Sequence, residues 1–402
     1  MDSILGMLMQ FYSALRPALI LQAASAAIAL LFLIGVARRA REHFRTRQFD
    51  ALSFKMHGQW RGIVRGEIAA ETWQNDPLKC DIVQSIIIHE IGAVTDKDRA
   101  GLQEFLRNSG LLGRCIERAY SAHGCARRRA MLALGEMRVP EAIAPLMEAL
   151  DDWQLDTRLM AVKALGRTGL AEAAEPILES YMVGALKVPE DPVSNALVRC
   201  YKNQPEALLP YLRRSLGESR ELLARVAGEL ATPEMADDMI LLSEDPGPEI
   251  RASAARALAV APLSVALPVL AKLIRDDIWF VRLRATSALN LIVHPRAIPF
   301  LLEAVRDSNR LVRIKAATAL AKFEHETVEI LQRIVDSRDR YALHAMIAAL
   351  ELEGGFGNIM EQLADPNRRD EASENLLDAL RKGSAGLWST RPADPVVESV
   401  FP

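Results

Sequence analysis

The chain has 402 residues, of which 50% are hydrophobic and only 5% aromatic, and its 49 basic and 52 acidic residues give a net charge of −3. This composition favours packed helices over a β-sandwich or a disordered chain. Without net positive charge the molecule lacks the field that holds a polyanion, which argues against a general nucleic-acid binder.

The N-terminal region contains a run of residues without charge at 17–37. As a helix rising 1.5 Å per residue, the run would cover about 30 Å, the thickness of the hydrocarbon core of a bilayer. It leads directly into arginines, whereas a secretory signal peptide would end in a small-residue cleavage site. The sequence therefore predicts an uncleaved transmembrane helix at 17–37, with a short apolar segment, 1–16, before it.

Basic residues that flank a membrane span are retained on the cytoplasmic side. Only Arg16 precedes the run, and five arginines follow it: Arg38, Arg39, Arg41, Arg45 and Arg47. We therefore expect a single-pass protein of a bacterial inner membrane, with its N-terminus outside and the remainder in the cytoplasm. A lipid- or nucleic-acid-binding patch is the weaker interpretation of the same arginines.

Residues 38–111 fit no repeat and are expected to form a basic juxtamembrane segment and a helical neck. Asp76-Pro77 and Thr95-Asp96 separate three apolar stretches of helical character. We expect this neck to cap the following array and to couple it to the anchor.

From 112 to 382 the sequence repeats with a period of about 31 residues. An Ala-Leu pair recurs at Leu134, Leu165, Leu197, Leu258, Leu289, Leu320, Leu350 and Leu380, and a degenerate copy at 220–227 fills the one long gap. The unit Arg-x-x-Ala-x-x-Ala-Leu places its apolar residues on one helical stripe, and a second apolar run precedes each copy. Each unit is thus a helical hairpin, which is too small to bury its own apolar face and must stack on its neighbours.

An aspartate precedes the arginine of the unit by six residues in four copies. A carboxylate at the start of the second helix accepts backbone N–H groups, and the arginine lies within reach of that carboxylate or the one in the next repeat. We interpret these residues as a ladder that links repeats, in preference to a row of charges for an anionic ligand. The ladder comprises Asp152 with Arg158, Asp245 with Arg251, Asp276 with Arg282, and Asp307 with Arg313.

These two signatures resemble the HEAT-repeat family, in particular the short repeats also found in phycobilisome lyases. The resemblance covers roughly 112–381 and is clearest at 152–169 and 245–321; the third, fourth and eighth copies depart from the pattern. It implies an all-α protein, an α-solenoid of HEAT-like hairpins preceded by one transmembrane helix, whose usual work is to hold other proteins.

Features of an enzyme are sparse in this sequence. His89-Glu90 and His325-Glu326 resemble the iron-binding pairs of deoxyhypusine hydroxylase, a HEAT-type enzyme, but the two pairs are far apart in the chain. We expect no metal, no cofactor, no small-molecule substrate and no catalysis. The alternative is a hydroxylase-like or lyase-like enzyme that uses the region of His89 or of Cys125, whose neighbours are three arginines. The cysteines form no CxxC pair and are interpreted as buried thiols: Cys80, Cys115, Cys125 and Cys200.

The expected function is binding. The second helices of a solenoid line its concave surface, and binding energy concentrates in a few aromatic or arginine anchors. The candidates lie at two corresponding turns: Trp279, Phe280, Arg284, Asn309 and Arg310. Packing between repeats is the alternative for these residues. We expect a protein partner, such as a membrane-embedded enzyme of envelope or polysaccharide synthesis, because the resemblance to membrane-tethered HEAT proteins points to a glycosyltransferase. Residues 383–402 are expected to form a flexible tail.

Overall fold

The computed structural model describes residues 30–62 with gaps at 42, 45, 56–57 and 61, residue 67, and residues 77–90, 96–364 and 371–389. All regular elements in these ranges are α-helices or short 3-10 helices, which confirms the predicted all-α class. The chain divides into two compact units between Pro145 and Leu146, and each is described by itself.

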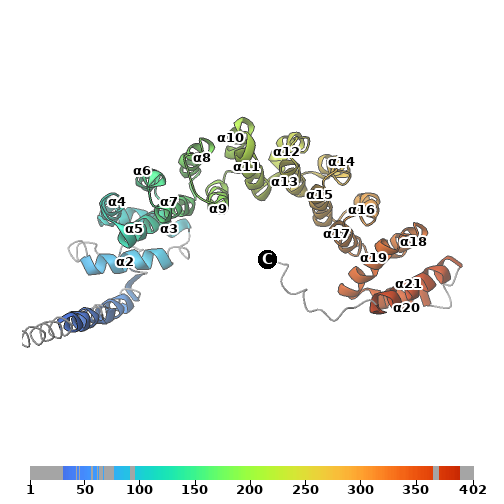
Figure 1. Cartoon of the computed structure of the whole chain (residues 1–402), viewed down its shortest axis with the longest axis horizontal. Helices are drawn as coiled ribbons and strands as arrows, with labels where there is room; N and C mark the ends of the chain where they lie inside the picture. The colour runs from blue at the N-terminus through green and yellow to red at the C-terminus, as the bar shows by residue number, and fades with distance from the viewer. Residues whose placement is uncertain are drawn as a thin grey trace, which may run out of the picture. The chain divides into compact units, whose positions relative to one another are not determined.

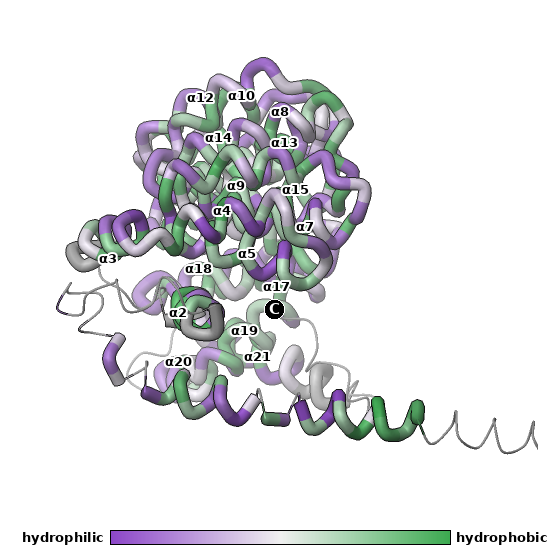
Figure 2. The backbone as a smooth tube through the Cα atoms, turned by 90° about the vertical axis from the view of Figure 1, so that its left-hand side faces the viewer, coloured by the Kyte–Doolittle hydropathy of each residue, from purple (hydrophilic) through white to green (hydrophobic). Residues whose placement is uncertain are grey.

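Residues 30–41 and 46–55 are helical. The apolar side chains of Leu30, Leu31, Phe32 and Leu33 are all exposed, and this stretch is continuously hydrophobic in Figure 2. Among the residues that the structure describes, no helix is both long and apolar enough to cross a membrane. Most of the span expected at 17–37 lies outside the described residues.

The remaining helices of the first unit pack around one hairpin. They are α2 (Pro77–Glu90), α3 (Asp96–Asn108), α4 (Leu111–Ser121) and α5 (Gly124–Met137). The neck helices α2 and α3 pack against the hairpin of α4 and α5, and Arg118 pairs with Asp81 of α2. These contacts join the hairpin to the neck helices, and the start of the repeat array at residue 112 stays a prediction.

The second unit repeats one pattern, an outer helix followed by an inner helix, and the two kinds of helix form two layers in Figure 1. After α6 (Ile143–Glu148), which spans the division, the outer layer contains α8 (Ala174–Met182), α10 (Leu209–Arg214), α12 (Ala236–Leu242), α14 (Leu263–Leu273), α16 (Ile298–Ala304) and α18 (Thr327–Asp336). The inner layer contains α7 (Leu155–Thr168), α9 (Glu190–Tyr201), α11 (Gly217–Leu230), α13 (Pro248–Ala257), α15 (Trp279–Ile292), α17 (Arg310–Leu320) and α19 (Arg340–Leu352), and α20 (Phe356–Ala364) and α21 (Glu371–Ser389) follow.

Consecutive inner helices pack directly on one another, and the small residues of the repeat signature form the contact. In α15 the side chains of Ala285, Ala288 and Leu289 are buried, as are the equivalent residues of α17. Alanine lets helix axes approach closely, and leucine fills the space between inner and outer helices. The predicted α-solenoid is therefore confirmed within the described residues.

Two glycines mark the tightest approaches in the inner layer. A Cβ built on Gly166 of α7 would lie 2.6 Å from the Cα of Ala196 in α9, and one on Gly228 of α11 would lie 2.9 Å from the carbonyl oxygen of Ser253 in α13. Both obstacles are backbone atoms, which cannot move aside as a flexible side chain would. These positions require glycine for packing, since neither has a positive φ.

The predicted tail requires one correction. Residues 383–389 belong to helix α21, contrary to the flexible tail expected from residue 383. A Cβ on Gly383 would meet the Ile347 side chain of α19 at 2.8 Å, so the small residue that suggested a flexible tail lets α21 pack closely on its neighbour. Residues 390–402 lie outside the described residues.

Replacing Gly166 with alanine is expected to lower the stability of the full chain by about 1–3 kcal/mol, because α7 and α9 must move apart. Gly113 in α4 is a matched control, since a Cβ there meets nothing within 4 Å. Gly113→Ala is expected to raise stability by about 0.5–1 kcal/mol through helix propensity. Urea unfolding followed by circular dichroism measures both changes, and equal effects of the two substitutions would contradict the packing argument.

Candidate protein-binding surface

An arginine at the start of several inner helices joins two repeats. In α13 the Nη1 atom of Arg251 donates to the carbonyl oxygens of Asp245 and Pro246, which are both 3.0 Å away in its own turn. Its Nε and Nη2 atoms donate to the carboxylate of Asp276 in the next repeat, at 2.7 and 3.0 Å. One guanidinium therefore fixes its own turn and also the adjacent hairpin.

The same arrangement recurs along the array. Arg282 donates to Asp307 at 2.6 and 2.9 Å, and Arg220 donates to Asp245 at 2.9 Å. The carboxylate of Asp276 is only 9% exposed and the guanidinium of Arg251 18% exposed, so salt screens this pair less than it screens a surface pair. Three aspartates predicted as part of a ladder, Asp245, Asp276 and Asp307, thus pair with an arginine of the preceding repeat.

Two aspartates of the ladder, Asp276 and Asp307, are held in the charged state. Burial raises the pKa of Asp276, but hydrogen bonds from the Arg251 side chain and the Ile278 amide outweigh burial, so that the pKa lies below its usual value. Burial also raises the pKa of Asp307, but the hydrogen bonds from Arg282 and the Asn309 amide outweigh burial, so that this pKa too lies below its usual value. Each aspartate therefore contributes more to folding when it is ionised.

The ladder changes at both ends. Arg158 has no carboxylate in the next repeat and donates instead to the carbonyl oxygen of Lys187, 3.0 Å away. Arg313 keeps the bonds to its own turn, but across the junction its guanidinium lies over the ring of Tyr341, 5.3 Å from the centroid. Among the described residues, the arginine–aspartate pairing of the ladder therefore links α11, α13, α15 and α17.

The predicted binding residues lie at the N-terminal ends of two adjacent inner helices. Trp279 and Phe280 open α15, with their rings perpendicular and 5.9 Å apart, and Trp279 is 42% exposed. Arg284 and Arg310 are exposed, whereas Asn309 caps α17 by accepting the Leu311 amide at 2.9 Å. The structure thus brings Trp279 and Phe280 together and gives Asn309 a structural role; binding by these residues stays a prediction.

Three exposed residues beside them were not predicted from the sequence. Leu311 and Ile314 of α17 are 52% and 43% exposed, and Tyr341 of α19 is 54% exposed. Leu311 and Tyr341 occupy the helix position that Phe280 occupies in α15, and Ile314 lies one turn further along. We call the four residues Phe280, Leu311, Ile314 and Tyr341 the apolar strip. Aligning the repeats by their helix caps would have shown this strip.

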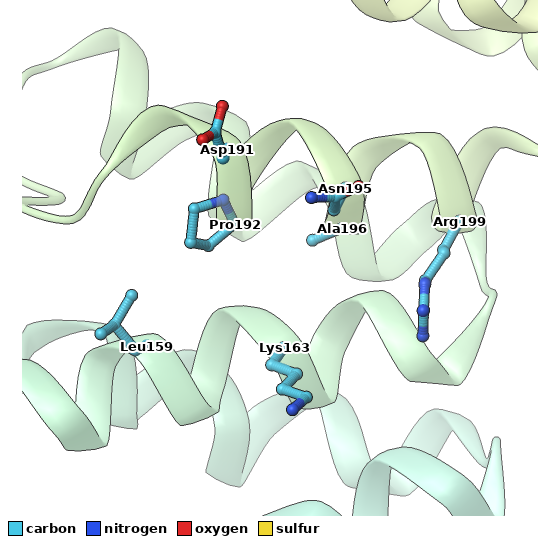
Figure 3. A pocket seen from close by; sticks show the side chains of 7 residues that line it. All are labelled: Leu159, Lys163, Asp191, Pro192, Asn195, Ala196 and Arg199. Atoms are coloured by element: carbon cyan, nitrogen blue, oxygen red, sulfur yellow. The ribbon is translucent and has the colours of Figure 1, made fainter. Parts of the chain in front are cut away.

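A second feature of the inner layer is a groove of about 560 Å³ between α7 and α9. Leu159, Pro192 and Ala196 supply apolar surface, and Lys163 and Arg199 supply positive charge. In Figure 3 Arg199 extends from α9 towards α7. The groove lies beside the close approach of Gly166 to Ala196, because Ala196 also lines the groove.

Sequence comparison agrees with this repeat geometry. A family model described as HEAT repeats matches residues 115–184, 205–290 and 279–351, which is more than half of the chain. The chain belongs to the HEAT-repeat family. The resemblance inferred from the two signatures is thereby confirmed. No curated protein matches the chain.

Several solved structures are similar to this HEAT-repeat chain. Human deoxyhypusine hydroxylase in complex with glycerol is 20% identical, with 70% of this chain and 96% of that chain covered and a TM-score of 0.27. A Kap121p mutant is 14% identical, with 78% of this chain and 40% of that chain covered and a TM-score of 0.46. Kap95p in its structure with RanGDP is 13% identical, with 76% and 53% covered and a TM-score of 0.40. These likenesses carry no argument about activity or partners.

The residues considered for catalysis lie partly outside the described part of this HEAT-repeat protein. No group of three or more histidine, cysteine or acidic residues is placed to hold a metal ion there, and the side chain of His89 lies outside that part. Cys80, Cys115 and Cys200 are buried as predicted, and burial raises the pKa of Cys115 and Cys200 to about 12. Cys125 is exposed, which corrects the prediction that all four thiols are buried.

The ladder predicts a pH-dependent loss of stability in Asp276→Asn. At pH 7 we expect a loss of about 2–3 kcal/mol, because the charged bidentate pair with Arg251 is broken. The folded-state pKa of Asp276 lies below its unfolded value of about 3.9. Its contribution is therefore complete above that value and disappears as the pH falls through the folded-state pKa.

Urea unfolding of Asp276→Asn and the parent chain at pH 7, 4 and 3 measures this difference, which should shrink towards acid pH. Glu244→Gln is the control, because the pair of Glu244 with Lys272 is exposed on both sides. The control should change stability by less than about 0.5 kcal/mol. A constant difference between Asp276→Asn and the parent at all three pH values would contradict the proposed ionisation.

Proposed function

We propose that this HEAT-repeat protein is a membrane-tethered scaffold that binds a protein partner along the inner layer of its second unit. The observation that carries the proposal is the apolar strip, in which Leu311 and Ile314 of α17 and Tyr341 of α19 stay about half exposed beside the partly exposed Phe280 of α15. Large apolar side chains that neighbours leave uncovered are typical of surfaces that bind other proteins. The ladder supports this role because the pair of Arg282 with Asp307 fixes the spacing between α15 and α17, two of the three inner helices that carry the strip.

The proposed tether is a single helix at 17–37, with the N-terminus outside and the solenoid in the bacterial cytoplasm. Two features support it. The run is free of charge and five arginines follow it, and the apolar side chains of its described part, from Leu30 to Ile34, are exposed on all sides of the helix. An apolar helix with no packed face is suited to lipid.

The proposed partner is a membrane-embedded enzyme of envelope or polysaccharide synthesis, such as a glycosyltransferase. A tether confines both proteins to two dimensions, which raises their effective concentration and lets a moderate interface hold a complex. The catalytic step would then belong to the partner, and the scaffold would supply position. Neither a cofactor nor nucleic acid is part of this proposal.

The proposal predicts that the full chain, crosslinked in its native membranes and purified in mild detergent, recovers one membrane enzyme in stoichiometric amount. A copy that ends at Arg47 keeps the tether and lacks the solenoid, so it should recover none. A copy that begins at Arg38 should leave the membrane fraction. Mass spectrometry and fractionation read these outcomes, and recovery of only lipid and the chain itself would contradict the scaffold function.

The alternative function is that of an enzyme, and one observation favours it: the exposed Sγ atom of Cys125, in the first turn of α5, accepts a hydrogen bond from Arg128 at 3.3 Å. We propose that Cys125 and His89 are dispensable. A variant with His89→Ala and Cys125→Ser should recover the same partner and support the same product yield in cells. A chain that binds its partner normally but loses product formation would instead establish catalysis at one of these residues.

A further inference from the structure

The first turns of the inner helices change character along the array. In α11 and α13 the second helical position carries a carboxylate, Glu218 and Glu249. In α15, α17 and α19 the equivalent position carries Phe280, Leu311 and Tyr341, and these three helices have no acidic residue in their first turn. A carboxylate there stabilises a helix through its dipole, so these helices give up a favourable charge for apolar side chains, of which Leu311 and Tyr341 are exposed and Phe280 is partly exposed.

Positive charge accompanies this change. Arg310 and Arg340 occupy the first position of α17 and α19, where a cation opposes the helix dipole. Arg284 of α15 and Lys315 of α17 lie about a turn further along, and α15 and α17 contain no acidic residue at all. In the described part of the chain, no carboxylate pairs with Arg284, Arg310 or Lys315.

We propose that the apolar strip binds an acidic segment of the partner protein, with apolar side chains on the strip and carboxylates on the surrounding cations. This proposal deepens the scaffold function and rests on it. The partner's carboxylates would meet four basic side chains and the N-terminal ends of α15 and α17, whereas the Asp339 carboxylate already caps α19 by accepting the amides of Tyr341 and Ala342. The strip supplies the apolar contact that holds the segment once it has been attracted.

The repeat spacing specifies the pattern of the segment. Packed helices lie about 8–10 Å apart, and an extended chain in the polyproline II conformation advances about 3.1 Å per residue with three residues per turn, so that every third side chain faces the same way. An extended segment running along the array therefore passes one inner helix every three residues. We expect apolar residues at every third position, over Phe280, Leu311 and Tyr341, and acidic residues between them.

Other occupants fit the strip less well. A lipid surface or a nucleic acid presents negative charge over a wide area, whereas the exposed carboxylates Glu249 and Asp277 border the strip on α13 and on the turn before α15. The basic area is therefore narrow, and residues 51–402 together carry a net charge of −6. A short acidic segment matches this area without facing the flanking carboxylates.

The test uses the full chain in detergent and a fluorescent peptide, Glu-Leu-Glu-Asp-Phe-Glu-Asp-Leu-Glu, with a control peptide of the same composition whose apolar residues are adjacent. Leu311→Glu and Tyr341→Glu place a carboxylate where α11 and α13 carry Glu218 and Glu249, so both variants should fold. Tyr341→Glu also removes the ring under Arg313, so thermal unfolding is measured for each variant. Leu241→Glu is the matched control, because Leu241 is a similarly exposed leucine in the outer helix α12. Binding is measured by fluorescence anisotropy at low and high salt.

We expect saturable, salt-sensitive binding of the first peptide that Leu311→Glu and Tyr341→Glu each weaken by about tenfold or more and that Leu241→Glu leaves unchanged. The control peptide should bind more weakly than the first. Absence of binding by the parent chain, or binding that both strip variants retain, overturns the proposal. Binding of phosphatidylglycerol vesicles to the parent chain, without peptide binding and with loss of vesicle binding in the same variants, also overturns the proposal. The strip would then bind a membrane.

Two further measurements exclude occupants from the chain itself. If analytical sedimentation shows that the parent chain is a dimer and that the Leu311→Glu variant is a monomer, the strip binds a second copy of the chain. Hydrogen-exchange protection of α17 that disappears when the chain is truncated after Ser389 would assign it to residues 390–402. Either result overturns the proposal.

The crosslinking experiment separates this inference from the scaffold function. If Leu311→Glu and Tyr341→Glu recover the membrane enzyme as the parent does, the scaffold stands and the strip proposal fails. If the parent chain recovers no partner, the scaffold function itself fails.

Discussion

The inter-repeat arginine is the interaction on which the second unit depends. A hairpin of about thirty residues has an apolar face that it cannot bury alone, so its stability comes from the junction with the next hairpin. Apolar packing is tolerant of small rotations and slides, whereas a guanidinium held by two carbonyl oxygens on one side and a carboxylate on the other accepts only one geometry. Arg251 and Arg282 thereby fix the position of each hairpin relative to the next, which apolar packing alone would leave variable. A binding surface formed by several hairpins requires that their relative positions be fixed.

Much of the fold follows from the sequence because the period is a direct consequence of stacking. The stripe of Arg-x-x-Ala-x-x-Ala-Leu predicts the inner helices, and its small residues predict their close approach. The partner of each arginine was harder to predict, since an aspartate six residues before it and one 25 residues after it both appeared within reach. The structure shows that Arg251 uses the backbone carbonyl of Asp245 and the side chain of Asp276. Sequence spacing alone does not distinguish these two contacts.

Other features could not be predicted because they depend on what each face meets after stacking. Gly383 suggests a chain break when it is read locally, yet it is the point at which α21 approaches the Ile347 side chain. Cys125 has the same residue type as three buried thiols, but it lies in the first turn of α5 on the exposed side. Leu311 and Tyr341 are residue types that are common in protein cores. Only the alignment of helix caps shows that they occupy an exposed helix position. Periodicity identifies which helix faces a neighbour but does not identify which residues remain uncovered.

The position of the apolar strip relative to the ladder has an energetic consequence. The arginine–aspartate pairing of the ladder ends with Asp307. At the junction of α17 with α19 the guanidinium of Arg313 lies over the ring of Tyr341 instead. A cation–π contact at a partly exposed site contributes less than a buried bidentate ion pair, so this junction is tied more weakly by polar contacts than the ones before it. A ligand that spans Leu311 and Tyr341 bridges this junction and binds only when α17 and α19 are stacked. Its binding free energy therefore adds to the stability of that junction, which couples occupancy of the strip to the order of the C-terminal repeats.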